Sequence, residues 1–132
     1  MTRLDKIQNG KPSLTESQIL RAIADYLQYA QNQGKLYYTR LNSGSAFVKR
    51  GNKFYKIQLC EEGTADFFVL TKLQSDLWIP RIIFVEVKSE KGRASPAQNA
   101  FQKLVENQLA EYVVVRSLGD LEGVLGFEKN KT

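Results

Sequence analysis

The sequence predicts an α/β fold in which helices flank a mixed β-sheet. Apolar residues recur at helical spacing in two long segments, 13–31 and 95–109. Between them lie several short segments rich in aromatic and β-branched residues, which is typical of strands. The second helical segment connects two such strands, and a crossover of this kind places them parallel in one sheet.

Composition indicates a single domain with a basic surface. The chain has 132 residues, of which 42% are hydrophobic, and its net charge is +5, which favours a polyanionic partner. We expect a flexible arm over 1–12, one domain over 13–127 and a frayed tail over 128–132. The sequence has neither an apolar run of the ~20 residues that a membrane span needs nor a secretory leader, so we expect a cytoplasmic protein without membrane contact.

The absence of histidine limits the chemistry that the chain can perform. Without this residue there is no Ser-His-Asp or Cys-His nucleophile and no histidine-ligated zinc. The lone Cys60 rules out an internal disulfide and fits a reducing compartment. Carboxylates, lysine, hydroxyls and a hard metal bound through oxygen remain.

The first helix is predicted over 13–31. Ser13 with Glu16 matches a capping box, and Thr15 with Gln18 offers an alternative start. The core-facing stripe contains Leu20, Ile23 and Leu27. Glu16 lies at the N-terminal end of this stripe, where a capping role and a role in a site explain it equally well.

Strands are predicted next. Segment 35–41 alternates and is rich in tyrosine, and it ends at the turn-forming Asn42-Ser43-Gly44. Segments 46–48 and 54–59 flank a basic hairpin tip, 49–53. A further strand covers 64–72.

The central strand, 81–90, contains an apolar run interrupted by two charges. Glu86 and Lys88 point to the same side of the strand, roughly 6–7 Å apart. Ile82 and Phe84 precede them on that face, so an apolar surface ends in a charged pair. Burying either charge alone would cost several kcal/mol, so the pair needs partners, a metal or access to solvent.

A hairpin centred near Asp76 would bring a second carboxylate to this pair. Residues whose numbers sum to about 152 would then lie opposite each other, and Asp66 and Glu86 satisfy this sum. Two adjacent carboxylates repel, and a divalent cation usually relieves that repulsion. A buried salt bridge among Asp66, Glu86 and Lys88 is the alternative.

The second helix begins with Ser95 as its N-cap, Pro96 at N1 and Gln98 completing a capping box. Its expected core stripe contains Phe101, Leu104, Val105 and Leu109. Gln98 lies on that stripe, three residues before Phe101, where capping alone and a role in a site explain it equally well. A strand over 111–117 follows, and Ser117 is expected to cap a short last helix with Leu121, Val124 and Leu125 inward.

At this point the residues resemble a known pattern. Gly63-Thr-Ala-Asp66 followed by Glu86-Val-Lys88 resembles motifs II and III of the PD-(D/E)XK nuclease superfamily, with Ala65 where the superfamily's name has proline. More narrowly, the chain is similar to the VRR-NUC family from about residue 13 to 125. The matching stretches are Thr15-Glu-Ser-Gln-Ile19, Arg40-Leu-Asn-Ser-Gly44, Phe84-Val-Glu-Val-Lys-Ser-Glu-Lys-Gly-Arg-Ala-Ser-Pro-Ala-Gln98, Tyr112-Val-Val-Val-Arg-Ser117 and Asp120-Leu121.

The resemblance implies a restriction-endonuclease-like core of order αβββαβ and a metal-dependent nuclease site. Its implied catalytic residues are Glu16, Asp66, Glu86, Lys88 and Gln98. Mg²⁺ or Mn²⁺ would bind to Asp66, Glu86 and the backbone carbonyl of Val87, with Glu16 reaching it directly or through water. Lys88 would orient or deprotonate the attacking water and stabilise the developing negative charge. Gln98 would position Lys88, the water or a phosphate oxygen. No nucleotide cofactor is expected.

The same resemblance implies DNA as the partner. The candidate DNA contacts are Arg40, Ser43, Lys49, Arg50, Lys53, Lys91, Arg93 and Arg116, the last as either a phosphate or a scaffold contact. Small free-standing members of this kind resemble phage-type enzymes that act as homodimers on branched DNA such as four-way (Holliday) junctions. A nuclease of another specificity, for flaps or restriction-like cutting, and a silent DNA-binding module are the alternatives.

Overall fold

The structure is a computed structural model that describes residues 7–8 and 11–127. The predicted tail, 128–132, lies outside the described residues, as does most of the predicted arm. The elements are β1 (Ile7–Gln8), β2 (Lys11–Pro12), α1 (Glu16–Asn32), β3 (Tyr37–Arg40), β4 (Ser45–Arg50), β5 (Lys53–Gln58), β6 (Phe67–Leu73), β7 (Asp76–Val87), α2 (Pro96–Asn107), β8 (Glu111–Val115) and α3 (Leu118–Leu125).

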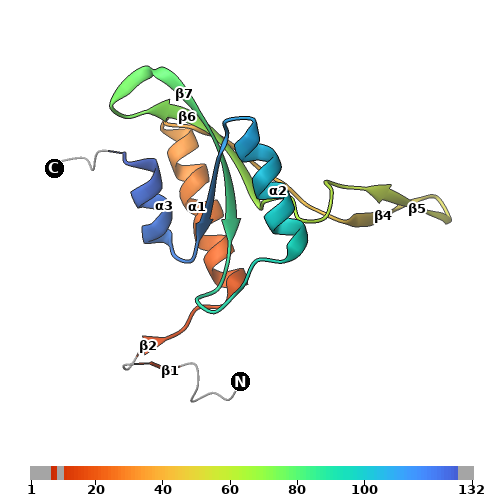
Figure 1. Ribbon diagram of the computed structural model, residues 1–132. Helices are drawn as coiled ribbons and strands as arrows, with labels where there is room; N and C mark the ends of the chain where they lie inside the picture. Colours follow the sequence, from red (N-terminus) through yellow and green to blue (C-terminus); the bar gives the residue numbers. More distant parts are fainter. Residues whose placement is uncertain (1–6, 9–10, 128–132) are drawn as a thin grey trace.

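A four-stranded mixed sheet forms the centre of the molecule (Figure 1), with the strand order β3-β6-β7-β8. β3 and β7 both pair antiparallel with β6, whereas β8 pairs parallel with β7 after the crossover through α2. The predicted fold class and the order αβββαβ are therefore confirmed. β4 and β5 form a separate two-stranded hairpin that projects from the body. None of the described helices is both long and apolar enough to cross a membrane.

The pairing of β6 with β7 has the predicted register. Phe67 lies opposite Val85 and Phe68 opposite Phe84, so that the numbers of each pair sum to 152. This register continues to Lys72 and breaks at Leu73, near the turn. Because Asp66 precedes this ladder and Glu86 follows it, their two side chains arrive at the same edge of the sheet.

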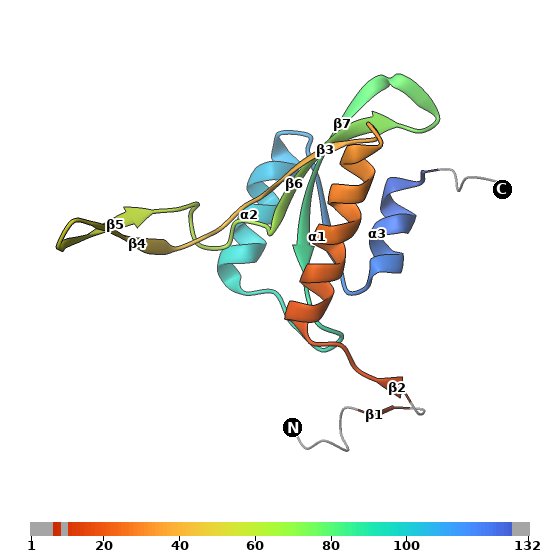
Figure 2. The ribbon, with the colours of Figure 1, turned by 180° about the vertical axis from the view of Figure 1, so that it is seen from behind.

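The two faces of the sheet are covered differently. In Figure 2, α1 and α3 lie in front of the sheet and α2 lies behind it. The face towards α1 and α3 holds the buried core: Ile19, Ile23, Leu27, Phe67, Val69, Ile83, Val85, Val87, Val115, Leu121 and Leu125. Alternation along the strands sends Phe68, Phe84 and Glu86 to the opposite face, towards α2.

Capping residues begin all three helices. α1 starts after Thr15, whose side chain and that of Gln18 form a complete capping box. The alternative start is therefore correct, and the start at Ser13 is wrong. Ser95 with Gln98, and Ser117, cap α2 and α3 as predicted.

α2 packs on the sheet through an aromatic cluster. The ring of Phe101 lies 5.2 Å from that of Phe84 and 6.1 Å from that of Tyr112. The predicted core stripe is wrong at Leu104 and Leu109, which are 67% and 93% exposed. Helical spacing identified an apolar face, but α2 covers only part of the sheet, so Leu104 stays exposed. Leu109 lies beyond the end of the helix and has a φ of 67°.

Candidate active site

Glu86 is the centre of the candidate site. Its side chain at the end of β7 is buried, and Oε1 accepts a hydrogen bond of 3.1 Å from Gln98 Nε2. The ammonium of Lys88 lies 3.7 Å from the same oxygen. The other oxygen, Oε2, is buried without a hydrogen-bond partner among the described residues. A buried carboxylate oxygen of this kind is costly unless a cation or a ligand occupies the adjacent space.

The surroundings of Glu86 favour its protonated form. The pKa of this carboxyl is raised from 4.5 to about 7, first by burial and then by the negative charge of Asp66, against the opposing charge of Lys88. Glu16 adds a smaller increase. Two neighbouring carboxylates therefore disfavour the ionised form of Glu86, and a cation bound there would favour it.

Asp66 is held between two strands. Its Oδ2 accepts the backbone N–H of Val87 at 2.7 Å, and its Oδ1 pairs with Arg40 Nη1 at 2.9 Å. The backbone N–H of Leu41 donates to the carbonyl oxygen of Asp66 at 2.8 Å. Asp66 is thus fixed relative to both β3 and β7. The structure places Arg40 inside the site, on a carboxylate, rather than at its rim.

Gln98 has two roles at once. Its Oε1 accepts the backbone N–H of Ser95 in the capping box, and its Nε2 donates to Glu86. Capping and a position in the site were alternatives for this residue in the sequence, and in the structure they coexist.

Gly63 is a positioning residue that the sequence did not single out beyond its place in a motif. Its φ is +90°, and a Cβ atom there would lie 2.4 Å from the carbonyl oxygen of Ala97, in the first turn of α2. Any side chain at this position would push away the helix turn that carries Gln98. The sequence shows a glycine three residues before Asp66, but it does not show that α2 packs against this glycine.

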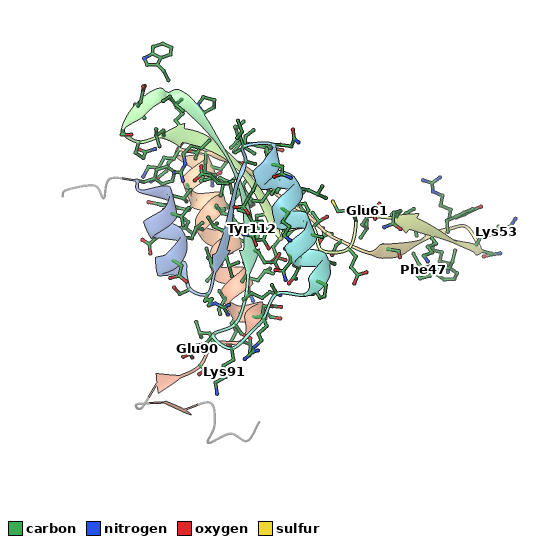
Figure 3. All side chains as sticks on the ribbon, viewed as in Figure 1. Phe47, Lys53, Glu61, Glu90, Lys91 and Tyr112 are labelled. Carbon is green, nitrogen blue, oxygen red and sulfur yellow. The ribbon has the colours of Figure 1, made fainter. Side chains whose placement is uncertain are left out.

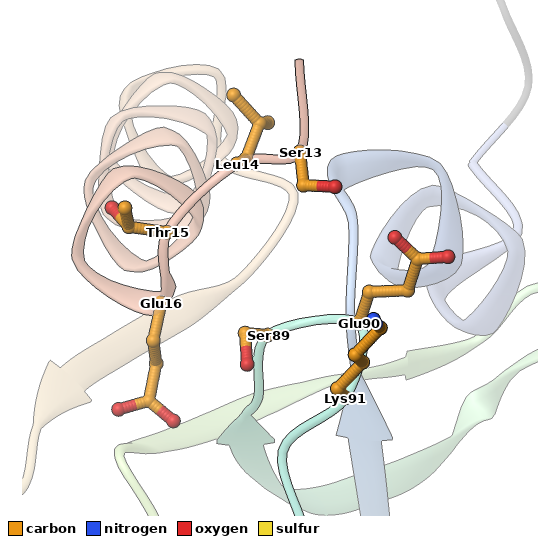
Figure 4. A pocket seen from close by; sticks show the side chains of 7 residues that line it. All are labelled: Ser13, Leu14, Thr15, Glu16, Ser89, Glu90 and Lys91. Atoms are coloured by element: carbon orange, nitrogen blue, oxygen red, sulfur yellow. The ribbon is translucent and has the colours of Figure 1, made fainter. Parts of the chain in front are cut away.

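Glu16 lies at the first position of α1, beside a cavity of about 270 Å³. Figure 4 shows this cavity between the start of α1 and the loop that follows β7. Its lining residues are Ser13, Leu14, Thr15, Glu16, Ser89, Glu90 and Lys91. Glu16 is exposed, so it can approach a ligand from this side.

Arg116 supports the loop after β7. Its Nη1 donates to the carbonyl oxygens of Ser89 and Gly92, at 2.7 Å each. Of the two roles expected for this residue, these contacts are those of a scaffold.

Tyr112 is a further residue that the sequence did not reveal. Burial raises the pKa of its hydroxyl to about 12, and the charges of Glu86 and Asp66 contribute to the increase. The phenol therefore stays protonated next to the carboxylates. Its proximity depends on the parallel pairing of Phe84 with Tyr112, a non-local contact.

The structure thus brings Glu16, Asp66, Glu86, Lys88 and Gln98 to one edge of the sheet. The other candidates lie further out. Lys91 lines the cavity, Arg93 is in the exposed loop before α2, and Ser43 forms an isolated bridge with Cys60. Lys49, Arg50 and Lys53 are on the projecting hairpin, and Figure 3 shows Lys53 far from the labelled Tyr112.

The donor atoms available here are oxygens. Within the described ranges, no three histidine, cysteine, aspartate or glutamate side chains are already gathered at metal-binding distances. Asp66, the unpartnered Oε2 of Glu86 and the carbonyl of Val87 are nevertheless a donor set of the type that hard divalent cations prefer.

The chain was compared with models of known protein families. The model of the VRR-NUC domain matches residues 14–118, which include every one of the five residues gathered at this edge. A comparison with curated proteins finds no match.

The raised pKa of Glu86 predicts a pH-dependent stability. A carboxyl whose pKa is higher in the folded than in the unfolded chain binds more protons when folded, so stability falls as the pH rises from 4.5 to 7. We expect a loss of up to about 3 kcal/mol in the free energy of unfolding, measured by urea denaturation in EDTA at pH 5 and pH 8. Glu86→Gln should remove this loss, and the exposed Glu106→Gln should not. If the free energy of unfolding of Glu86→Gln depended on pH as strongly as that of the wild type, the raised pKa would not belong to Glu86.

The close approach at Gly63 predicts an unusually large effect of a single methyl group. Gly44 has the same φ of +90° but open space around its Cβ position, so Gly44→Ala measures the backbone strain alone. We expect Gly63→Ala to lower the free energy of unfolding by about 1–3 kcal/mol more than Gly44→Ala does, because it adds the clash with Ala97. Urea denaturation of both variants provides the comparison, and equal losses would show that α2 moves without cost.

Proposed function

The chain belongs to the VRR-NUC family of nuclease-type domains, and from this premise we propose that it is a metal-dependent endonuclease that hydrolyses phosphodiester bonds in branched DNA. One observation carries the proposal. A buried Glu86, one oxygen of which has no partner in the part of the chain that the structure describes, lies beside Asp66, Lys88 and Gln98 at a single sheet edge. A salt bridge alone would not compensate the burial of this oxygen.

We propose that Mg²⁺ or Mn²⁺ is held by Asp66, Glu86 and the backbone carbonyl of Val87, with Glu16 in contact directly or through water. The unpartnered Oε2 of Glu86 and the raised pKa of this carboxyl both fit such an ion. The chemistry that the ion supplies when bound is neutralisation of phosphate charge and a lowered pKa of a bound water.

Lys88 is the proposed proton-handling and charge-stabilising group. Its side chain is only 12% exposed, and the contact with Glu86 aims its ammonium at the carboxylates. From there it would orient or deprotonate the attacking water and stabilise the charge that develops on the phosphate. Gln98 would hold Glu86 in place through its hydrogen bond. The products would carry 5′-phosphate and 3′-hydroxyl ends.

Basic residues around the site would bind the DNA backbone. Lys91 lines the cavity next to Glu16, Arg93 is in the exposed loop before α2, and Arg40 contacts Asp66. Binding should therefore weaken as the salt concentration rises. A panel of DNA substrates distinguishes the possible outcomes, which are specificity for four-way junctions, for flaps or for duplex sites, and binding without cleavage.

Removal of the site's charges should abolish cleavage. Asp66→Asn keeps an acceptor for the Val87 N–H, and Lys88→Met keeps the aliphatic length, so both variants should fold. We expect each to lower the cleavage rate by about 10²- to 10⁴-fold on labelled junction, flap, single-stranded and duplex DNA. EDTA should stop the wild-type reaction.

The matched controls are Asp25→Asn and Lys103→Met, which change exposed residues of the same types on α1 and α2. They should cut at the wild-type rate. Cleavage that survives EDTA, or that persists in Asp66→Asn, would refute the mechanism. Binding without cutting under either metal would establish the silent module instead.

Paired cuts across a junction predict a homodimer. Each chain has one proposed site, so two opposed cuts need two copies related by a two-fold axis. Gel filtration with light scattering should give a mass of about 30 kDa, twice the 15.0 kDa of the chain. A monomer at micromolar concentration would count against paired cutting while leaving single cuts possible.

A further inference from the structure

The hairpin of β4 and β5 forms a separate unit of the structure. Its six residue pairs, from Ser45 with Gln58 to Arg50 with Lys53, make a sheet of their own. It extends away from the helices in both views (Figures 1 and 2). Phe47 and Phe54 are 71% and 68% exposed there. Large exposed apolar groups clustered on one element indicate a binding surface rather than a folding requirement.

One face of the hairpin alternates aromatic and cationic side chains. Phe47 lies opposite Lys56, and Lys49 lies opposite Phe54. Because alternate residues share a face, these four side chains form one surface, here called the Phe-Lys face. The ammonium of Lys49 lies 5.8 Å from the ring centroid of Phe54. Figure 3 shows Phe47 at the hairpin, well away from the body.

The charge of the hairpin selects the class of partner. Segment 45–58 contains four cationic residues, Lys49, Arg50, Lys53 and Lys56, and no acidic one. These account for most of the net charge of +5. A second copy of the chain would face like charge, whereas a polyanion is attracted. Aromatic rings among cations are the combination that binds single-stranded nucleic acid, by stacking on bases and pairing with phosphates.

The base of the hairpin is joined to the candidate active site. Leu41, just before the hairpin, donates its N–H to the Asp66 carbonyl. At the other end, the N–H of Cys60 donates to the carbonyl of Asn42 at 2.9 Å, which closes the base. DNA that leaves the site on this side would therefore meet the hairpin.

We propose that the Phe-Lys face recognises unpaired bases of the DNA substrate, with Phe47 and Phe54 stacking on bases and Lys49 and Lys56 contacting the adjacent phosphates. This rests on the proposed nuclease function and makes it more specific. The rings have no access to bases stacked within a duplex, so the face selects DNA that carries unpaired bases near a branch.

Binding measurements on the full chain in EDTA test this selection without cleavage. Fluorescence anisotropy would compare single-stranded DNA, a junction with unpaired bases at the branch point and a matched blunt duplex. We expect Phe47→Ser/Phe54→Ser to weaken binding of the first two at least about tenfold and of the duplex less than about threefold. Leu77→Ser/Trp78→Ser, at the exposed end of the other hairpin, should leave all three affinities unchanged.

The lysines give an independent readout. Lys49→Met/Lys56→Met should weaken binding and lower the slope of log affinity against log salt by about 1.4 on single strands, because two phosphate contacts are lost. The phenylalanine variant should leave that slope unchanged. Because the hairpin adds nothing to the buried core, the unfolding midpoints of both variants should equal that of the wild type.

Several results would overturn the proposal. One is a loss of affinity in Phe47→Ser/Phe54→Ser that is equal for duplex and unpaired DNA, and another is no loss of affinity at all. A third is conversion of a wild-type dimer to a monomer by this variant, which would make the hairpin an interface between copies. Failure of the nuclease function gives a different pattern. The wild type would then not cut any DNA, while the phenylalanine variant would still lose its preference for unpaired bases.

Discussion

A carboxylate buried at the end of the central strand is the constraint on which the rest of the site depends. Glu86 is placed where one oxygen contacts Gln98 and the other has no partner among the described residues. Burial raises the pKa of Glu86, and the charge of Asp66 increases the effect. Such a position lowers the stability of the fold. A bound cation, as proposed above, would offset this cost.

Three separate features hold this carboxylate in position. The register of β6 against β7 sets the distance between Asp66 and Glu86, and the aromatic cluster docks α2 on the sheet. Gly63 then allows the first turn of α2 to come close enough for Gln98 to reach the site. Two of these features are backbone geometry, so the precision of the site comes from the fold more than from its polar side chains.

The sequence predicted what depends on local pattern and on short hairpins. Capping boxes, the register sum of 152 and the parallel crossover all follow from residues close in the chain or from topology. The pairing of Arg40 with Asp66 and the position of Tyr112 depend on neighbours far apart in sequence. Helical spacing also placed Leu104 in the core, because an apolar stripe does not report how much sheet lies beneath it.

The two faces of the sheet differ in how densely they are packed. Residues facing α1 and α3 are almost all fully buried, whereas the face towards α2 contains Glu86, exposed Ile82 and a helix without a buried residue. A dense core on one side offsets the cost of a buried charge on the other. Changes on the α2 face, and on the hairpin beyond it, can therefore alter chemistry and substrate choice while the fold persists. This separation explains how a chain of 132 residues tolerates a destabilising site.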